Sequence, residues 1–231
     1  MSEGIHSKHR ERVRKEFLEH GFNDATPNHK LIEMLLFYSI PRKDTNELAH
    51  TLINRFGSLS ALLEADPKEL LKVEGVGENT ASLKKLIMPI ARAYQNEKGT
   101  DNVKFNNMDE LCGFLMKKYF GFTKEVFSLI SFDSRGKLIG FDILNSGDIT
   151  SVAISTRNVI ETVLKRNAVC VILAHNHPDG NALPSTDDIT STERINSALK
   201  TINVRLMDHI ILATDDYVSL AQSDYYRYLF T

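Results

Sequence analysis

Residues 175–188 read His-Asn-His-Pro-Asp-Gly-Asn-Ala-Leu-Pro-Ser-Thr-Asp-Asp, and the spacing of metal-binding side chains is the most informative feature of the chain. His175 and His177 are separated by one residue, so in an extended segment both imidazoles point to the same side. A carboxylate, Asp188, follows them, with Ser185 three residues before it. Three protein ligands leave a tetrahedral zinc ion with a fourth position for water, as in catalytic zinc sites. The stretch therefore indicates a zinc hydrolase.

Part of this stretch has a second explanation. Ser185 and Asp188 also have the spacing of a capping box, in which a serine caps a helix and an acidic residue reaches back to the serine amide. Taken alone, that pair favours the cap. Asp187 is a rival third ligand, although on a helix it points about 100° away from Asp188. His209 follows Asp208 in an apolar strand, and we expect it to be a structural histidine.

The segments around the histidines alternate between strand and helix patterns. Residues 168–174 form a continuous apolar run, which suits a strand covered on both faces and ends directly before His175. A turn at 133–136 predicts a hairpin between two further strands. The predicted helices are 108–119, 157–166 and 187–202, and the other predicted strands are 126–132, 137–144 and 204–213. The second half of the chain is therefore predicted to be an α/β domain.

The first half is predicted to be helical. Between residues 8 and 93, apolar residues recur at three- and four-residue spacing, with Thr45 and Asp66 placed to cap helices and Gly57 placed to end one. A polar segment without periodicity follows at 95–102. These patterns predict an all-α domain at 1–95, a linker at 96–103 and the α/β domain at 104–231.

Composition sets limits on the function. The 231 residues are 42% hydrophobic and 25% charged, with a net charge of −2, which does not favour a tight nucleic-acid binder. There is no apolar run long enough to cross a membrane and no secretory leader, so we expect a cytoplasmic protein without a membrane partner. Cys112 and Cys170 are expected to be free, buried thiols. The basic cluster at 6–15 is interpreted as a solvated helix face, with nucleic-acid contact as the alternative.

Residues 71–81 resemble a helix-hairpin-helix module. Gly75 and Gly77 permit a tight turn whose backbone amides, together with the next helix, can hold a DNA phosphate without reading sequence. Lys84 and Lys85 are expected to supply positive charge nearby. A plain turn between helices is the alternative, since Gly-x-Gly is a weak signal.

The complete pattern is more specific than its parts. His175-x-His177-x7-Ser185-x-x-Asp188 resembles the JAMM (JAB1/MPN/Mov34) metalloenzyme motif, and its context resembles the bacterial RadC family, in the residues Asn176, Pro178, Pro184 and 208–211. The resemblance covers nearly the whole chain. It implies a layered α/β (α+β) JAMM/MPN-type C-terminal domain, a small all-α N-terminal domain, and one Zn2+ per chain held by His175, His177 and Asp188.

The resemblance also implies a reaction. Glu125, at the start of the strand 126–132, corresponds to the family's glutamate, which accepts a proton from a zinc-activated water and passes it to the leaving amine. Ser185 is expected to hydrogen-bond the oxyanion. The family pattern predicts Ser where this chain has Asp179, and Pro-Arg-Glu where it has Thr156-Arg157-Asn158, but no predicted ligand is lost.

The predicted function is therefore a JAMM-type metallopeptidase or isopeptidase, with a peptide or protein substrate that the sequence does not name. The alternative is a DNA-binding protein associated with repair, which uses the Gly75–Gly77 turn and has an auxiliary zinc site. The presence of every predicted ligand disfavours a scaffold with a decayed site.

Overall fold

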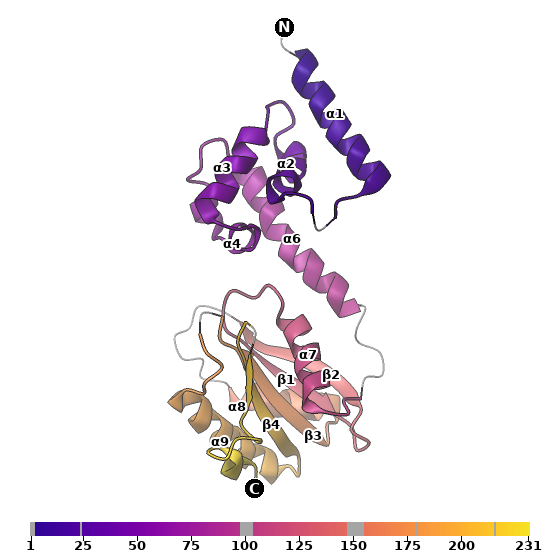
Figure 1. Cartoon of the computed structure of the whole chain (residues 1–231). Helices are drawn as coiled ribbons and strands as arrows, with labels where there is room; N and C mark the ends of the chain where they lie inside the picture. The colour runs from indigo at the N-terminus through magenta and orange to yellow at the C-terminus, as the bar shows by residue number, and fades with distance from the viewer. Residues whose placement is uncertain (1–2, 24, 98–103, 147–154, 179, 215) are drawn as a thin grey trace. The chain divides into compact units, whose positions relative to one another are not determined.

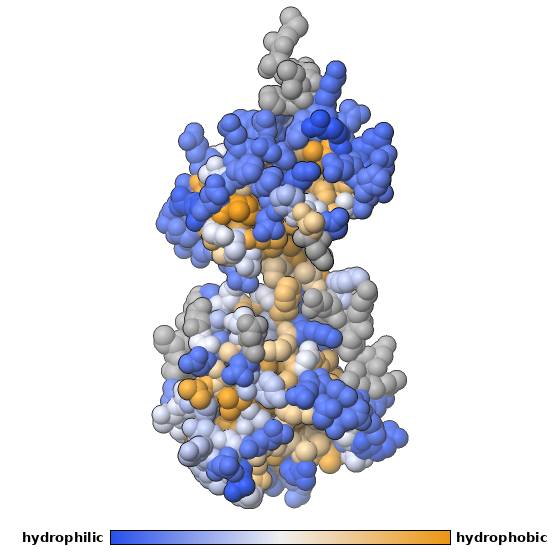
Figure 2. Space-filling view, in the orientation of Figure 1, coloured by the Kyte–Doolittle hydropathy of each residue, from blue (hydrophilic) through white to orange (hydrophobic). Residues whose placement is uncertain are grey.

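The computed structural model describes residues 3–23, 25–97, 104–146, 155–178, 180–214 and 216–231. The chain forms two compact units, Met1–Ala91 and Arg92–Thr231 (Figure 1). Within the described residues, no helix has the length and apolar character needed to cross a membrane. On the face shown in Figure 2, the surface of each unit is mostly hydrophilic, with apolar residues in small groups.

The first unit is helical. Its helices are α1 (Glu3–His20), α2 (Asn28–Ser39), α3 (Asn46–Phe56), α4 (Leu59–Glu64), α5 (Pro67–Leu70) and α6 (Glu78–Glu97), the last of which continues into the second unit. Its core is formed by apolar side chains of α2 to α5 and of the turn that follows α5.

The predicted helix ends in this unit are mostly present. Gly57 ends α3 in a left-handed conformation with φ 83°, and Asp66 caps α5 through the backbone N–H of Lys68. Thr45 precedes α3, but its side chain makes no capping hydrogen bond. The helix α6 continues to Glu97, two residues into the predicted linker, whose residues 98–103 lie outside the described residues.

The second unit contains a five-stranded sheet in the order β2-β1-β3-β4-β5. The strands are β1 (Val126–Phe132), β2 (Leu138–Ser146), β3 (Cys170–Asn176), β4 (Arg205–Leu212) and β5 (Tyr217–Ser219). β1 runs antiparallel to both of its neighbours, β3 runs parallel to β4, and β4 runs antiparallel to β5. The parallel pair is connected by a helix, as parallel neighbours require.

Helices cover both faces of this sheet. The helix α7 (Met108–Tyr119) packs on one face, where its apolar side chains meet Ile130 and Ile172. The helices α8 (Thr156–Arg166) and α9 (Thr186–Thr201) pack on the other face, against Leu129 and Leu173 (Figure 1). A short 3-10 helix, η1 (Arg227–Phe230), follows β5. The central strands are buried on both faces, which explains why 168–174 shows no alternation of apolar and polar residues.

The architecture is the layered α/β fold expected for the C-terminal part of the chain. The predicted helix 108–119 and strand 126–132 have the bounds found for α7 and β1, and the hairpin connects β1 to β2 as predicted. The apolar strand is shifted, because β3 starts at Cys170 and includes His175 and Asn176.

Candidate metal centre

His175 and His177 lie at the C-terminal end of β3. The pairing of His175 with Phe127 of β1 puts the His175 ring on the sheet face that α9 covers. His177 follows the strand, and its backbone N–H donates to the carbonyl oxygen of Leu212 at 2.7 Å, which extends the pairing with β4. The two Nε2 atoms are 2.9 Å apart. The end of β3 therefore holds the two rings at one point.

Asp188 reaches the same point from the first turn of α9. The capping box is present: the backbone N–H of Asp188 donates to Ser185 Oγ at 3.2 Å, and Asp188 Oδ2 accepts from the Ser185 backbone N–H at 2.7 Å. The second carboxylate oxygen, Oδ1, lies 3.2 Å from His175 Nε2. The cap and the metal-ligand explanation are thus compatible, because the cap occupies one oxygen and turns the other towards the histidines.

A chain of buried hydrogen bonds fixes the tautomer of His175. Thr192 Oγ1 donates its only proton to the main-chain oxygen of Asp188 at 2.6 Å, because a carbonyl can only accept. It must therefore accept from His209 Nδ1, which is also 2.6 Å away. His209 Nε2 then has a lone pair and accepts from His175 Nδ1 at 2.9 Å. His175 Nε2 is left with its lone pair free for a metal.

The tautomer of His177 follows in the same way. Its Nδ1 lies 3.0 Å from the main-chain oxygen of Asn181 and must donate to it, so Nε2 carries the lone pair. The ligating atoms of His175, His177 and Asp188 all lie within 4.8 Å of one another. They are all acceptors, and a cation between them satisfies them together.

The spacing of these atoms suits zinc. Bonds of about 2.0–2.1 Å in a tetrahedral site place neighbouring ligand atoms about 3.3 Å apart. The closest approaches here are 2.9 Å between the two histidine Nε2 atoms and 3.2 Å from His175 to Asp188. Two neutral imidazoles and one carboxylate also form a donor set that zinc commonly takes. The residues present therefore fit a zinc ion.

Electrostatics favour an ionised carboxylate and a neutral supporting histidine. Burial alone would raise the pKa of Asp188, but its contact with His175 and the hydrogen bonds from the Ser185 hydroxyl and backbone N–H hold it below its ordinary value. Burial lowers the pKa of His209 well below its ordinary value. A carboxylate must be unprotonated to bind a metal ion, and the surroundings of Asp188 favour its ionised form.

Glu125 lies directly before β1, with its side chain exposed. The side chain of Asn176 holds this segment from both sides, since its Oδ1 accepts from the Val126 backbone N–H at 2.8 Å and its Nδ2 donates to the Lys124 oxygen at 3.1 Å. Because Phe127 pairs with His175, continuing the antiparallel register places Glu125 opposite His177. The structure thus brings the backbone of residue 125 to the histidine end of β3.

Ser185 is exposed at the start of α9. Its hydroxyl donates to Asp188 Oδ2 at 2.7 Å and accepts from the Asp188 backbone N–H. To donate to an oxyanion, as the sequence predicts, the hydroxyl must release Asp188. In the geometry observed, Ser185 orients the carboxylate.

The remaining predicted residues have separate positions. Asp187 is exposed and does not belong to the group of ligand atoms that His175, His177 and Asp188 form. Thr156 begins α8, which Ser155 caps through the Asn158 backbone N–H. Asp179 lies outside the described residues.

The predicted phosphate-binding turn lies between α5 and α6. Gly75 has φ 87°, a left-handed conformation, and α6 begins directly after Gly77. The side chain of Lys84 is buried, and its Nζ donates to the main-chain oxygen of Ala65, so its charge is turned to the interior rather than to the surface of the turn. Lys85 is exposed.

Sequence reasoning did not assign a role to three residues around the histidines. The sequence indicates Asn176 only as part of the motif and His209 only as a structural histidine. It gives no indication of a role for Thr192. The lone histidine in an apolar strand was a usable signal for His209. The pairing of β3 with β4 that brings it behind His175 has a register irregularity between Val171 and Ile172, which alternation along the sequence does not show.

Comparison with known proteins places the chain in a family. The family model of the RadC-like JAB domain matches residues 105–225, which contain the whole histidine cluster. The chain belongs to the RadC family.

Two curated relatives match this chain almost end to end. UPF0758 protein FN0909 of Fusobacterium nucleatum subsp. nucleatum is 33% identical over 229 residues, which cover 96% of this chain and 98% of that protein. A UPF0758 protein of Carboxydothermus hydrogenoformans is 31% identical over 209 residues, which cover 90% of this chain and 92% of that protein. Neither name states an activity.

Proposed function

We propose that this RadC-family protein is a zinc-dependent hydrolase of the JAMM type, a metallopeptidase or isopeptidase that cleaves an amide bond. One observation carries the proposal: the lone pairs of His175 and His177 and the free oxygen of Asp188 converge, and the hydrogen bonds on their far sides leave them only acceptor character. The JAB domain match supports the same class.

In this proposal His175, His177 and Asp188 hold the zinc ion. Bound there, zinc supplies a Lewis acid that activates water for attack on a carbonyl group at neutral pH. Three protein ligands fit a catalytic site with an open position better than a closed structural site. His209 and Thr192 keep His175 in the tautomer and orientation that binding needs.

Glu125 is the proposed general base and acid. It takes a proton from the attacking water and returns it to the leaving amine, so the amide bond is cleaved without net proton change at the carboxylate. Its position opposite His177 and the hold of Asn176 on both neighbouring backbone groups support this role. Ser185 is the proposed donor to the oxyanion, once its hydroxyl has turned from Asp188.

Zinc content and turnover together test the proposal. Protein purified without added metal or chelator is expected to contain about one zinc per chain, as a three-ligand site provides. His177→Ala is expected to lose it, whereas His20→Ala, which removes an exposed histidine of α1, is expected to keep it.

Glu125→Gln separates metal binding from chemistry. It is expected to retain zinc and to lose cleavage of the peptides and isopeptide-linked peptides that wild type cuts in a fluorogenic library. Absence of zinc from wild type even after loading, or full activity in Glu125→Gln, would reject the proposal.

DNA binding by the helical unit is a second candidate. The left-handed Gly75 and the start of α6 directly after Gly77 give the turn that phosphate binding requires. The burial of Lys84 reduces the charge available there. Fluorescence anisotropy with duplex and branched DNA at two salt concentrations tests this function, and binding that is absent or insensitive to salt rejects it.

A further inference from the structure

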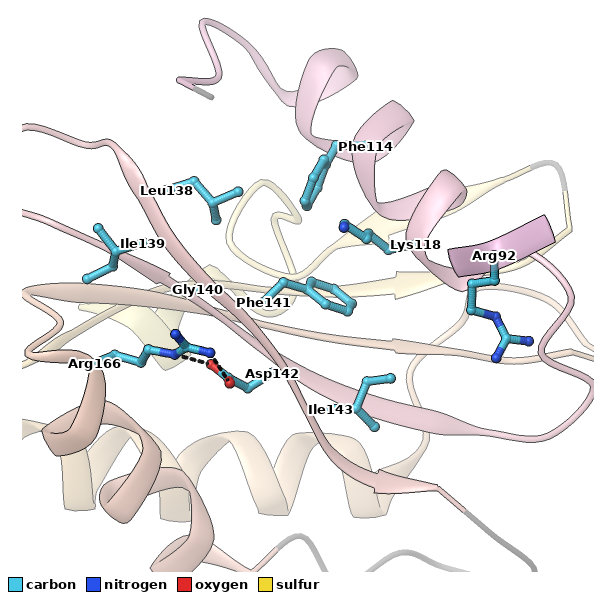
Figure 3. Close-up of a pocket in the computed structure, with 10 residues that line it drawn as sticks. All are labelled: Arg92, Phe114, Lys118, Leu138, Ile139, Gly140, Phe141, Asp142, Ile143 and Arg166. Atoms are coloured by element: carbon cyan, nitrogen blue, oxygen red, sulfur yellow. Dashed lines mark hydrogen bonds and ion pairs between the residues drawn. The ribbon is translucent and has the colours of Figure 1, made fainter. Parts of the chain in front are cut away.

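A cavity of about 540 Å³ lies along β2, one of the two edge strands of the sheet. It is separate from the candidate metal centre, since β1 lies between β2 and the strand that carries His175. Figure 3 shows Phe114 and Lys118 of α7 on one side of β2 and Arg166 of α8 on the other, with Arg92 of α6 at one end. The volume is within the range of about 300–1,000 Å³ that small-molecule sites occupy.

Lys118 is the unusual member of this cavity. Only 7% of its surface is exposed, and among the described residues it has no hydrogen-bond or ion-pair partner. Its Nζ lies 5.2 Å from the ring centre of Phe114 and 5.7 Å from that of Phe141. The rings stabilise the charge, but an ammonium group also has three N–H donors to satisfy. Burial lowers the pKa of Lys118.

The other charged groups leave the cavity positive. Asp142 is the only acidic residue among the described residues that line it, and it is occupied by Arg166 through two hydrogen bonds of 2.9 and 2.6 Å. Arg92 lies 3.5 Å from the ring centre of Phe122 and donates through Nε and Nη2 to the main-chain oxygens of Phe120 and Gly121. Two cations, Arg92 and Lys118, thus remain without an acidic partner among the lining residues.

The remaining walls are apolar. Phe114, Leu138, Phe141 and Ile143 line the cavity, and Ile143 is 47% exposed. A site with apolar walls and two cations that have no acidic partner among the lining residues suits an anion joined to an apolar body better than an inorganic ion or a neutral molecule.

We propose that this cavity is a second binding site, which takes a small organic anion: a carboxylate or phosphate group on an aromatic or aliphatic body. Lys118 and Arg92 bind the anionic group, and Phe114, Phe141 and Ile143 contact the body. This site goes beyond the proposed hydrolase function and does not depend on it.

Two fluorescent probes that differ only in charge test the site. 8-Anilinonaphthalene-1-sulfonate carries an anion, and N-phenyl-1-naphthylamine has the same aromatic framework without it. In Lys118→Met, the affinity for the anionic probe is expected to fall about tenfold, as the loss of a hydrogen-bonded charge implies. The affinity for the neutral probe is expected to stay within about twofold, because the apolar walls are retained. Lys117→Met, at an exposed neighbour on α7, is expected to leave both affinities unchanged.

Two further measurements exclude a purely structural role for the lysine. Thermal unfolding of Lys118→Met is expected at a temperature no lower than that of wild type, because methionine keeps the apolar contacts of the side chain and, among the described residues, no hydrogen bond or ion pair of the lysine is lost. Ile143→Glu, at the exposed wall, is expected to lower the affinity for the anionic probe and to leave the affinity for the neutral probe unchanged. The proposal is rejected if the anionic probe binds wild type and both variants equally, or if both probes weaken together. Zinc content stays at the wild-type level throughout, so this result is independent of the hydrolase test.

Discussion

The ring of His209 lies behind that of His175, with 2.9 Å between His209 Nε2 and His175 Nδ1. His209 is fully buried and cannot touch a substrate, so its influence on the site passes through His175. Together with Thr192 it connects one predicted ligand, His175, to the backbone of another, Asp188.

His209→Phe keeps a buried ring but removes the acceptor for His175 Nδ1. Zinc affinity is expected to fall about 10- to 100-fold, as for other residues that orient a metal-binding histidine. Competition with a chromogenic chelator measures it. His209→Gln, whose amide oxygen can accept the same hydrogen bond, is expected to lose less, and wild-type affinity in His209→Phe would contradict this role.

Ser185→Ala removes both the cap of α9 and the group that holds Asp188 Oδ2. It is expected to cost about 0.5–2 kcal/mol of unfolding free energy and to weaken zinc binding. Ser155→Ala, which removes the cap of α8 in the same unit, is the matched control. It is expected to cost a similar free energy in urea unfolding with zinc affinity unchanged. Equal zinc affinity in the two variants would mean that the cap does not orient Asp188.

Asn176→Ala leaves the Val126 N–H and the Lys124 oxygen without their side-chain partner. The expected loss is about 1–3 kcal/mol of unfolding free energy, together with lower turnover at retained zinc content, because Glu125 lies between those two groups. Asn181→Ala removes an exposed side chain but keeps the main-chain oxygen that binds His177. It is expected to change stability by less than about 0.5 kcal/mol. If Asn176→Ala matches this control in stability and turnover, the positioning of Glu125 by Asn176 is wrong.

Gly75→Ala and Gly77→Ala are expected to differ. At Gly75, φ is 87° and an added Cβ meets the Leu48 side chain at 3.5 Å, so alanine is expected to cost about 1–2 kcal/mol. At Gly77, which is not left-handed, an added Cβ meets nothing within 4 Å. Equilibrium unfolding measures both. Gly77→Ala is therefore the better variant for DNA-binding assays, because it changes the turn at a smaller cost in unfolding free energy. Equal unfolding free energies of the two variants would contradict the strain at Gly75.

Cys112 is expected to be unreactive in the folded protein. Burial, with smaller contributions from Asp208 and Asp109, raises the pKa of Cys112 to about 12, so very little thiolate exists at mildly alkaline pH. In a Cys170→Ser background, labelling by a thiol reagent is expected to occur at the rate of unfolding. Rapid labelling of folded protein would contradict the burial of Cys112.

The sequence predicted those parts of the molecule that depend on local patterns. Apolar alternation and apolar runs located β1, β3 and α7, and the spacing of the motif brought together the three residues that the structure places within 4.8 Å. The capping-box alternative could not be separated from the ligand explanation, because the same Asp188 serves both geometries with different oxygens.

Features that depend on long-range pairing could not be predicted. The partner of His175 is set by the parallel pairing of β3 with β4, whose register irregularity breaks the alternation. The burial of Lys84 depends on the carbonyl of Ala65, which comes from another helix end. Lys118 is buried because α7 packs beside β2, and the sequence of α7 alone does not reveal that packing.

β3, α9 and β4 form a single parallel crossover, and the three proposed ligands, together with His209 and Thr192, lie within it. Glu125 comes from outside, at the front of β1. In the proposed hydrolase, the residues that bind the ion and the residue that transfers the proton therefore come from different segments of the chain. A single substitution at Glu125 would therefore remove the proposed proton transfer and leave the residues that would bind the ion, and the parts of the fold that a bound ion would connect, unchanged.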